Sequence, residues 1–483
     1  MGSITFYGGI GTIGGNMFLV KSKNTRIFLD FGKNFSAERD FFEFPVLRPS
    51  NLHDLLKLEL LPDLKGLYRF DESPSLVNGV FLTHAHLDHY GYIPCLRKDT
   101  NIFLGACTKR LIDLRSHMSP STWDTKLEHL KFTLIKTNDE INIADDFVMR
   151  PIHVDHSVPG AYGFVIHVEN KTLVYTGDFR FHGYASPLTA DFLDRVVKED
   201  VDLFLCEGTN VQPTTQTSHN EAGWSQANEP SEDRIALEKL ETEKEVLDKL
   251  VLISDNTEGL VLYDMTLADI DRLRTVWQAA EKTGRRILYD SRQAYLLLFL
   301  NAERKLLSNL PEKGDFDIYL DRLKKRGEES YIESFRTGRK LHDKMLLENL
   351  GRDDLFIWGP EGRQRILANG SSILLCTSNG ISQLLQFKEK GREINGVFVY
   401  GRSEPYNEEA ELTFKKLQNW IRICNMGFDS AHTSGHASQK DIASMIEILD
   451  PALTIPVHTE HPGQFTGFTK RLYLPKHGET YAF

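Results

Sequence analysis

The sequence lacks the features that mark membrane proteins and disulfide-bonded proteins. No apolar run approaches the roughly 18 residues that a bilayer span needs, and "AYLLLFL" (294–300) is short enough to be a helix of a globular core. The N-terminal "MGSITFYGG" has no basic region followed by a long apolar one, so no signal peptide is expected. The cysteines are odd in number, widely spaced and without a C-x-x-C pair: Cys95, Cys107, Cys206, Cys376 and Cys424. We therefore expect a soluble chain in a reducing, cytoplasmic compartment.

Positively charged residues are also fewer than negatively charged ones. The 483 residues carry 57 Lys and Arg against 68 Asp and Glu, for a net charge of −11. Such a chain is not an obvious nucleic-acid binder, and any basic surface has to be gathered locally. The candidate stretches are 281–293, 321–327 and 334–344, although such a stretch is more often an ordinary solvated face.

A glycine motif near the N-terminus imitates a dinucleotide-binding site. "GGIGTIGG" contains G-x-G-x-x-G at Gly9, Gly11 and Gly14, and Asp30 follows at roughly the required spacing. That fingerprint needs a helix after the glycines, whereas "NMFLVKSKNTRIFLDFG" indicates a strand, a turn and a second strand. The glycines are therefore expected to form a tight loop between strands.

The pattern of elements changes twice along the chain. Short strand-like segments dominate up to about residue 210, which suggests packed sheets. The polar stretch 211–233 ends in a capping signal at Ser231, which predicts a long helix from there. Helical and strand segments alternate from about 232 to 390, as in an α/β domain, and the strand-like "INGVFVYGR" opens the last part from about 395.

"THAHLDHYG" (83–91) brings four metal-capable groups together after the apolar segment "NGVFL". Alternate residues of a strand share a face, so His84 and His86 are expected to point the same way, and a turn would carry Asp88 and His89 toward a second point. Imidazole and carboxylate ligands suit zinc or manganese. Four such groups cannot fill two metal sites, so this interpretation demands further ligands downstream.

Three further candidates follow predicted strands. They are His156 in "IHVDHSVPG", Asp178 in "LVYTGDF" and His458 in "LTIPVHTEH". With the first cluster they make seven ligands, which is the right number for two metals that share one carboxylate.

The motifs resemble those of the metallo-β-lactamase fold, and specifically of its β-CASP nuclease branch, with RNase J the most similar family. "GGIGTIGGNMFLV", "FLTHAHLDHYGYIP", "DHSVPGAYG", "TGDFRFHG" and "EGTN" occur in the family's order, and "HTSGHAS" with "PVHTEH" completes the set. The resemblance covers nearly the whole chain. It implies an αββα sandwich with an inserted β-CASP α/β domain: 1–210 and 395–483 would form the metallo-β-lactamase domain and 211–394 the insertion.

The resemblance also implies roles for individual residues. His84, His86 and His156 would hold one metal, and Asp88, His89 and His458 the other, with Asp178 as the bridge, Asp88 also acting in catalysis and Asp30 orienting ligands from behind. His436 would protonate the leaving oxygen while hydrogen-bonded to Glu207, which stands where RNase J usually has Asp. Candidates for a terminal 5′-phosphate are Arg402, Ser403 and Ser434.

The function that the resemblance implies is a nuclease with two divalent ions, zinc foremost and manganese as the alternative. It would hydrolyse phosphodiester bonds of single-stranded RNA from the 5′ end, with endonuclease activity as a further option, and leave 5′-phosphate products. The alternatives are a DNase of the same fold and a catalytically inactive nucleic-acid-binding subunit. A homodimer or a protein partner is compatible with the sequence.

Overall fold

The computed structural model describes residues 2–43, 46–119, 122–213, 237–300, 310–312, 314–320, 346, 348, 355–376, 381, 384–387, 394–404 and 408–483. The chain divides into two compact units. The first combines Met1–Pro230 with Gly435–Phe483, and the second is Ser231–Ser434. The first unit is therefore discontinuous in sequence, and the second is inserted into it.

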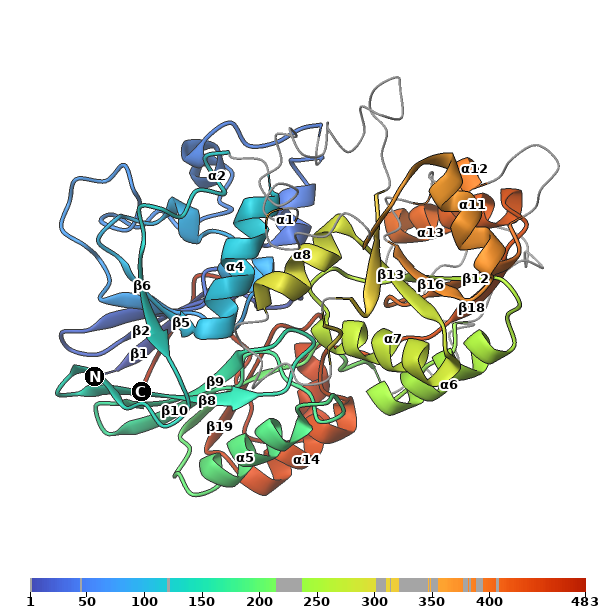
Figure 1. Ribbon diagram of the computed structural model, residues 1–483. Helices are drawn as coiled ribbons and strands as arrows, with labels where there is room; N and C mark the ends of the chain where they lie inside the picture. The colour runs from blue at the N-terminus through green and yellow to red at the C-terminus, as the bar shows by residue number, and fades with distance from the viewer. Residues whose placement is uncertain are drawn as a thin grey trace, which may run out of the picture. The chain divides into compact units, whose positions relative to one another are not determined.

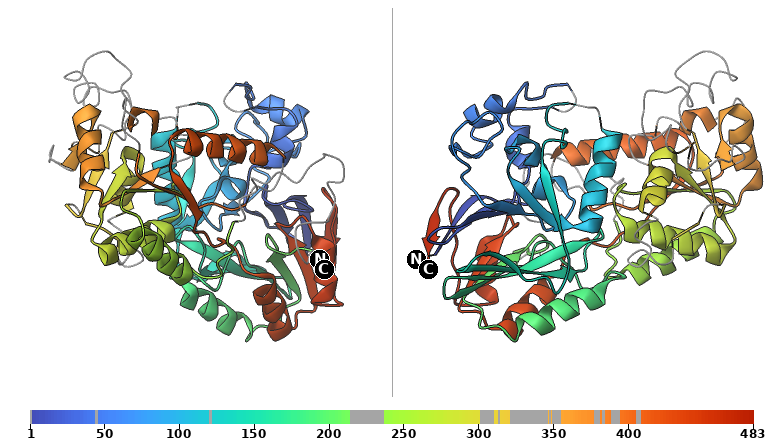
Figure 2. Two further views of the ribbon diagram at one scale, coloured as in Figure 1. Left: turned by 90° about the vertical axis from the view of Figure 1, so that its right-hand side faces the viewer. Right: turned by 60° about the vertical axis from the view of Figure 1, so that its left-hand side comes forward.

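The first unit is built on two sheets (Figure 1). The seven-stranded sheet has the order β20 (Thr480–Ala482), β1 (Ser3–Gly8), β2 (Met17–Lys21), β3 (Arg26–Leu29), β4 (Gly79–Phe81), β5 (Asn101–Gly105) and β6 (Lys131–Ile135). The six-stranded sheet has the order β19 (Leu453–Val457), β11 (Leu203–Glu207), β10 (Lys171–Tyr175), β9 (Ala161–Val168), β8 (Phe147–Val154) and β7 (Ile141–Ala144). Because β1 pairs with β20, the two ends of the chain lie side by side (Figure 2).

Alternating apolar residues hold the two sheets together. In β1, Ile4 and Phe6 are fully buried between less buried neighbours, as the two-residue period of a strand requires. They belong to a core that also contains Phe164 and Ile166 of β9, so this core lies between the sheets. Burial of this apolar surface is the main force that stacks one sheet on the other.

Helices cover the outer faces of this sandwich. Those of the first unit are α1 (Phe35–Arg39), α2 (Leu52–Lys57), α3 (Leu87–Tyr90), α4 (Ala106–Met118), α5 (Ser186–Val196) and α14 (Gln439–Leu449), with short 3₁₀ turns at Ile93–Cys95 and Pro462–Gly467. Helices α5 and α14 lie together on the six-stranded sheet, where Phe192 and Ile442 join a second core (Figure 1). The predicted αββα sandwich is thus confirmed.

The glycine-rich segment is a loop between β1 and β2, as predicted, and no helix follows it. Gly14 has a φ of +82°, in the left-handed region, and a Cβ there would lie 2.7 Å from the side chain of Asp88. Glycine is therefore required both by the backbone and by the approach of Asp88.

The second unit is an α/β domain around one parallel sheet. Its strand order is β15 (Phe356–Ile357), β14 (Phe316–Tyr319), β13 (Arg286–Asp290), β16 (Ser372–Cys376), β12 (Leu260–Asp264), β17 (Gly396–Tyr400) and β18 (Gly427–Ser430). Its described helices are α6 (Glu243–Asp255), α7 (Ile270–Thr283), α8 (Ser291–Leu300), α11 (Gly359–Asn369), α12 (Leu384–Phe387) and α13 (Glu408–Ile423). The expected core helix at "AYLLLFL" is the second half of α8.

The structure differs from the sequence-based expectations at the borders of this unit. The predicted insertion ends at 394, yet β17 pairs with β12 and β18 pairs with β17, so 396–430 lies in the sheet of the inserted unit. The predicted helix from Ser231 is wrong at its start among the described residues, because α6 begins at Glu243 with Thr242 capping the amide of Glu245. Residues 214–236 lie outside the described part of the chain.

Two of the three predicted basic stretches, 321–327 and 334–344, also lie outside the described residues. In the third, Arg285 donates to the carbonyl oxygens of Ser254 and Gly259, and Arg286 is paired with Asp317 at 2.8 Å. These two guanidinium groups hold neighbouring loops of the unit. Among the described residues, no helix is both long and apolar enough to cross a bilayer.

Candidate metal centre

Strand ends and the loops that follow them supply every predicted ligand of the first unit. After β4 the chain passes through His84 and His86 into the single turn of α3, which carries Asp88 and His89. His156 follows β8, Asp178 follows β10 and His458 follows β19. β8, β10 and β19 belong to one sheet and β4 to the other, so the ligands come together where the two sheets end.

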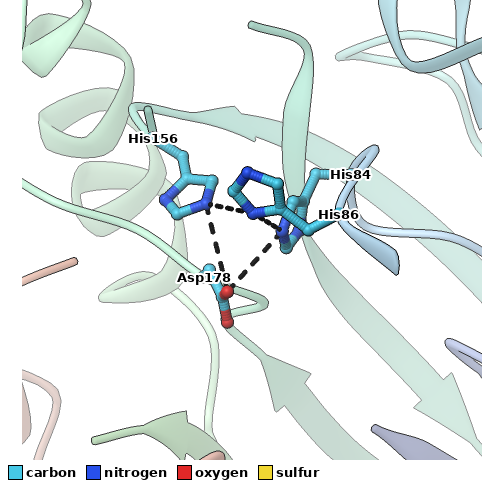
Figure 3. A group of neighbouring side chains, drawn as sticks. All are labelled: His84, His86, His156 and Asp178. Atoms are coloured by element: carbon cyan, nitrogen blue, oxygen red, sulfur yellow. Dashed lines mark hydrogen bonds and ion pairs between the residues drawn. The ribbon is translucent and has the colours of Figure 1, made fainter. Parts of the chain in front are cut away.

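Three imidazoles and one carboxylate form the first group (Figure 3). Nδ1 of His86 lies 3.0 Å from Nε2 of His84 and 3.1 Å from Nε2 of His156. Oδ2 of Asp178 lies 3.6 Å from the His84 nitrogen and 4.0 Å from the His156 nitrogen. Four ligand atoms from three segments of the chain therefore face one point.

The second group lies on the other side of the same carboxylate. Nε2 of His458 is 3.1 Å from Oδ2 of Asp88 and 3.7 Å from Oδ2 of Asp178. Nε2 of His89 is 3.1 Å from Oδ2 of Asp178 and 3.9 Å from Oδ2 of Asp88. Oδ2 of Asp178 thus belongs to both groups, as a bridging ligand would.

The donor set fits divalent cations. Both oxygens of Asp178 are buried, and among the described residues neither meets a donor in hydrogen-bond geometry. A buried carboxylate without partners is costly, and a cation would remove that cost. Around a tetrahedral zinc with Zn–N of about 2.0–2.1 Å, ligand atoms lie about 3.3 Å apart, which is close to the spacing of the His84, His86 and His156 nitrogens.

Asp30 holds the second group from behind. It is fully buried, and its carboxylate lies 2.7 Å from Nδ1 of His89 while accepting hydrogen bonds from the Thr83 amide and the Tyr175 hydroxyl. The Nδ1–H of His89 therefore points at Asp30. Burial would lower the pKa of His89, but the carboxylates of Asp178 and Asp30 outweigh burial and raise that pKa well above its ordinary value, so an ion would take the place of the proton on Nε2. A carboxylate behind a metal-binding histidine is a recurrent way of fixing the ring and its tautomer.

The other imidazoles are fixed in the same manner. Nδ1 of His156 is 2.6 Å from the carbonyl oxygen of Gly435, and Nδ1 of His458 is 2.8 Å from the hydroxyl of Thr209. Nδ1 of His84 is 3.0 Å from the hydroxyl of Thr83. In each case the nitrogen that faces away from the group is occupied, so the nitrogen that faces the group is free to bind.

Burial keeps the first group in the protonation state that metals require. It lowers the pKa of His84 and His156 well below the ordinary value and that of His86 to about 4. Burial alone would raise the pKa of Asp178, but the neighbouring His458 and His89 outweigh burial and hold that pKa well below its ordinary value. Neutral imidazoles beside a carboxylate anion are the form that binds a cation.

His436 lies next to this cluster with a different partner. Its Nδ1 is 3.2 Å from Oε1 of Glu207, at the end of β11. Burial would lower the pKa of His436, but the carboxylates of Glu207 and Asp178 outweigh it and raise the pKa to about 9. A histidine that keeps its proton near neutral pH is equipped to donate one.

The candidate phosphate residues lie in the second unit. Nη2 of Arg402, just after β17, is 2.9 Å from Oδ1 of the buried Asp264, so part of its charge is already compensated. The hydroxyl of Ser403 lies 3.2 Å from Nε2 of His432. Ser434, half-buried, is the last residue of this unit.

Several polar residues around the site were not predicted from the sequence. The hydroxyl groups of Thr83 and Thr209 contact candidate ligands, and that of Tyr175 contacts Asp30. In the second unit, His432 lies beside Ser403. Residues with a hydroxyl group form no recognisable motif in this sequence. They could have been found only by their closeness in sequence to candidate site residues, because Thr83 precedes His84 and Thr209 lies two residues after Glu207.

An αββα sandwich whose strand ends carry a cluster of histidines and aspartates defines the metallo-β-lactamase superfamily. In agreement, residues 62–232 match the family model described as "Beta-lactamase superfamily domain". Residues 425–479 match the model described as "Zn-dependent metallo-hydrolase RNA specificity domain". The chain is therefore similar to RNase J-like members of this superfamily, and its His/Asp cluster has the ligand types of a site for divalent metal.

Curated relatives extend the similarity over almost the whole chain. Ribonuclease J of Helicobacter pylori is 23% identical over 95% of this chain and 56% of the relative. Ribonuclease J 1 and Ribonuclease J 2 of Streptococcus pyogenes serotype M3 are 24% and 26% identical, over 97% and 94% of this chain and 71% and 69% of the relatives. The chain thus spans little more than half the length of the H. pylori relative.

A solved structure has the same fold over its full length. It is a crystal structure of a protein of unknown function from Enterococcus faecalis V583, with a TM-score of 0.71 and 20% sequence identity, and the match covers 99% of both chains.

Proposed function

We propose that the protein is a metal-dependent ribonuclease that hydrolyses phosphodiester bonds of single-stranded RNA. The observation that carries the proposal is the convergence of seven ligand atoms in two groups that share Asp178, with the His436–Glu207 pair beside them. The similarity to proteins named Ribonuclease J and to an RNA specificity domain favours RNA over DNA. A cytoplasmic location belongs to the same proposal and is supported by four buried free thiols, Cys95, Cys107, Cys206 and Cys424.

The proposed cofactors are two divalent ions, zinc foremost and manganese as the alternative. His84, His86, His156 and Asp178 would hold one ion, and Asp88, His89, His458 and Asp178 the other. When bound, two such ions supply an activated water near neutral pH and offset the negative charge that builds on the phosphate. Nitrogen and oxygen ligands of this kind are compatible with either metal.

The protein's own groups then orient the substrate and deliver a proton. His436 is proposed to protonate the leaving 3′ oxygen, and the Glu207 carboxylate keeps that proton on the ring until it is needed. Glu207 is itself fixed, because it accepts hydrogen bonds from the backbone amides of Phe179 and Thr209. Because the bond from phosphorus to the 3′ oxygen breaks, the upstream fragment gains a 3′-hydroxyl and the phosphate stays on the 5′ end of the downstream fragment.

We propose 5′→3′ exonuclease activity, with endonuclease activity as an additional mode. Arg402, Ser403 and Ser434 are the candidates for binding a terminal 5′-phosphate. The polar pair of Ser403 and His432 supports this assignment, since a hydroxyl and an imidazole are both able to donate to phosphate oxygens.

One experiment separates metal binding from proton delivery. His458→Ala is expected to lose metal from the second group and, with it, most activity. His436→Ala should retain the parent's metal content and lose only proton transfer, a step typically worth about 10²–10⁴ in rate. Glu207→Gln should resemble His436→Ala in a milder form. The measurements are metal content per chain and single-turnover rate; loss of metal in His436→Ala, or a near-normal rate in His458→Ala, would overturn the assignment.

A second experiment identifies the substrate. Matched RNA and DNA strands of equal length should be digested side by side, each with a 5′-phosphate or a 5′-hydroxyl end. Faster release of mononucleotides from 5′-phosphorylated RNA is expected. Preferential cleavage of DNA would select the DNase alternative, and no cleavage of any strand by the metal-loaded protein would select the inactive nucleic-acid-binding subunit.

A further inference from the structure

Thr209 lies between two histidines to which the proposed function gives different tasks. Its hydroxyl oxygen is 2.8 Å from Nδ1 of His458 and 3.2 Å from Nδ1 of His436. The same oxygen is 3.4 Å from the carbonyl oxygen of His458. A single hydroxyl thus touches a proposed metal ligand and the proposed acid.

The hydrogen-bonding capacity of a hydroxyl permits a consistent arrangement of these contacts. A threonine hydroxyl has one hydrogen to donate and two lone pairs to accept with. A carbonyl oxygen can only accept, so the Thr209 hydrogen is directed to the His458 carbonyl, and both lone pairs are left for the two ring nitrogens. Each Nδ1 then carries its hydrogen toward Thr209, and the hydrogen of His436 is shared with Oε1 of Glu207, which is also 3.2 Å away.

We propose that Thr209 is a positioning residue that fixes the tautomer and orientation of His458 and, at the same time, the orientation of His436. With hydrogen on Nδ1, the Nε2 of His458 is free to bind the second ion, and the Nε2–H of the protonated His436 is directed toward the leaving oxygen. The part concerning His436 rests on the proposed nuclease function, whereas the part concerning His458 rests only on metal binding.

The neighbours of Thr209 keep its hydroxyl in place. The side-chain amide of Asn210 donates to the carbonyl oxygens of His436 and Ala437, at 3.0 Å each. A Cβ on Gly208 would lie 2.7 Å from the ring of Phe465, so the backbone there is packed closely against the 3₁₀ turn that follows β19. The segment from Glu207 to Asn210 is therefore held to His436 by the side chains of Glu207, Thr209 and Asn210, and Thr209 has little room to turn away.

The first test measures zinc affinity by competition with a chromophoric chelator, using the full-length chain. Thr209→Val replaces the hydroxyl with a methyl group of the same shape. Loss of a hydrogen-bond partner behind a metal-binding histidine typically costs about 10–100-fold in metal affinity, and we expect a loss of this size at one of the two ions. Thr209→Ser restores the hydroxyl and should restore most of the affinity.

Thr454→Val is the matched control. Thr454 lies on β19, four residues before His458, and is more deeply buried than the partly buried Thr209, but its hydroxyl has no hydrogen-bond partner among the described residues. The same chemical change on the strand that precedes His458 should therefore leave zinc affinity at the parent value. Should Thr209→Val fail to fold, Thr209→Ala against Thr209→Ser gives the same comparison.

The second test measures single-turnover RNA cleavage at saturating zinc. Thr209→Val should slow cleavage in the parent background because His436 is no longer oriented. In a His436→Ala background the same substitution should cause no further loss of rate, although it should still weaken zinc binding.

The outcomes distinguish this proposal from the proposed function. If the protein cleaves no RNA but Thr209→Val weakens zinc binding and Thr209→Ser restores it, the tautomer assignment of His458 stands and the nuclease proposal fails. Unchanged zinc affinity in Thr209→Val, or an equal loss in Thr209→Ser, would overturn the role of the hydroxyl.

Discussion

At the scale of single residues, Asp30 shows how much the metal centre depends on a side chain that would bind no ion. Its φ is +56°, in the left-handed region that non-glycine residues rarely adopt. Such strain is retained where the surroundings determine it, and here three groups donate to one carboxylate: His89, Thr83 and Tyr175. The backbone conformation is what points this carboxylate at His89.

Asp30→Asn is expected to weaken metal binding about 10–100-fold, the usual cost of losing a partner behind a metal-binding histidine. The amide nitrogen that replaces one oxygen is a donor, and it cannot accept from Nδ1–H of His89. Metal titration of the purified variant gives the measurement. Tyr175→Phe is the comparison: it removes one donor to Asp30 but leaves the carboxylate facing His89, so its loss should be smaller. Equal losses in both variants would argue for a general packing defect.

The candidate ligands could be selected from the sequence because each follows a recognisable strand and each is a residue type with few other uses at such a place; that they bind metal stays a prediction. His84, His156 and His458 are of this kind. The hydroxyl groups of Thr83 and Thr209 could not be predicted, since threonine occurs throughout strands and loops. Arg285 was interpreted as a surface cation, but carbonyl oxygens that are distant in sequence surround its guanidinium.

At the scale of elements, one buried ion pair ties α7 to the start of α6. Arg272 is fully buried, and its guanidinium lies 3.0 Å from the carboxylate of Glu243. The same guanidinium also contacts the hydroxyl of Tyr263 on β12 and the carbonyl oxygen of Ala431 after β18. Two helices and two strand ends of the second unit therefore share one cation.

Arg272→Met should lower the stability of the second unit by about 3–5 kcal/mol, because it leaves the Glu243 carboxylate buried without its cation. Arg286→Met is the matched control: its side chain is 41% exposed and pairs with Asp317, and such a pair is worth about 0–1 kcal/mol. Urea unfolding of both variants supplies the comparison. In addition, Arg272→Met with Glu243→Leu should recover much of the loss, and a double variant as unstable as Arg272→Met would contradict this explanation.

His153 on β8 gives the first unit a dependence on acid. Burial lowers the pKa of His153 from 6.5 to about 4, and the ring stacks on Tyr162 with its Nδ1 3.1 Å from the Thr137 hydroxyl. The unfolded chain takes up a proton near pH 6.5 and the folded chain only near pH 4. The neutral ring therefore makes its full contribution to the free energy of unfolding above pH 6.5. As the pH falls from 6.5 toward 4, the free energy of unfolding decreases by on the order of 2 kcal/mol.

His153→Gln should make stability less sensitive to this pH range. The measurement is the urea midpoint of the metal-loaded parent and variant at pH 7.5 and pH 5. For each protein, the change in the urea midpoint between pH 7.5 and pH 5 is determined. Release of metal at pH 5 contributes equally to both changes, so the difference between them measures the contribution of His153. Identical shifts would show that the ring is not held neutral.

The sequence predicted the type of most elements better than their ends. Residues of β8 largely alternate between deeper and shallower burial, whereas β9 and β10 were predicted as short apolar runs bounded by polar turns. The start of α6 was missed, since Ser231 and Thr242 are both good capping residues and local preference does not choose between them.

At the scale of the whole molecule, bound metal should be a major source of stability. A ligand that binds only the folded state stabilises it by about 4.1 kcal/mol at a thousand times its dissociation constant. Removal of metal with a chelator is therefore expected to lower the unfolding temperature measured by calorimetry. Asp178→Asn, which removes the shared carboxylate charge, should unfold at a temperature that the chelator scarcely changes. A parent protein indifferent to the chelator would contradict metal binding at this cluster.

The αββα fold and the presence of an insertion were predictable because the motifs of the first unit occur on both sides of it. Its far border was not. The sequence of β17 by itself predicts a strand. It does not show whether that strand pairs with β12 or with a strand of the other unit. Parallel pairing joins segments that are far apart in sequence, so the partner of a strand is a property of the whole fold.

The discontinuous first unit has a consequence for the order of events on the ribosome. All residues of the first group have been synthesised once the ribosome has added Asp178. His458, which belongs to the second group, is added 280 residues later, after the whole inserted unit. At about 5–20 residues per second, that interval lasts roughly 15–55 s. β19, the edge strand beside β11, is also missing until then. Under the proposed assignment of ligands, a nascent chain would therefore be able to bind one cation early, whereas the second site would be complete only when synthesis is nearly finished.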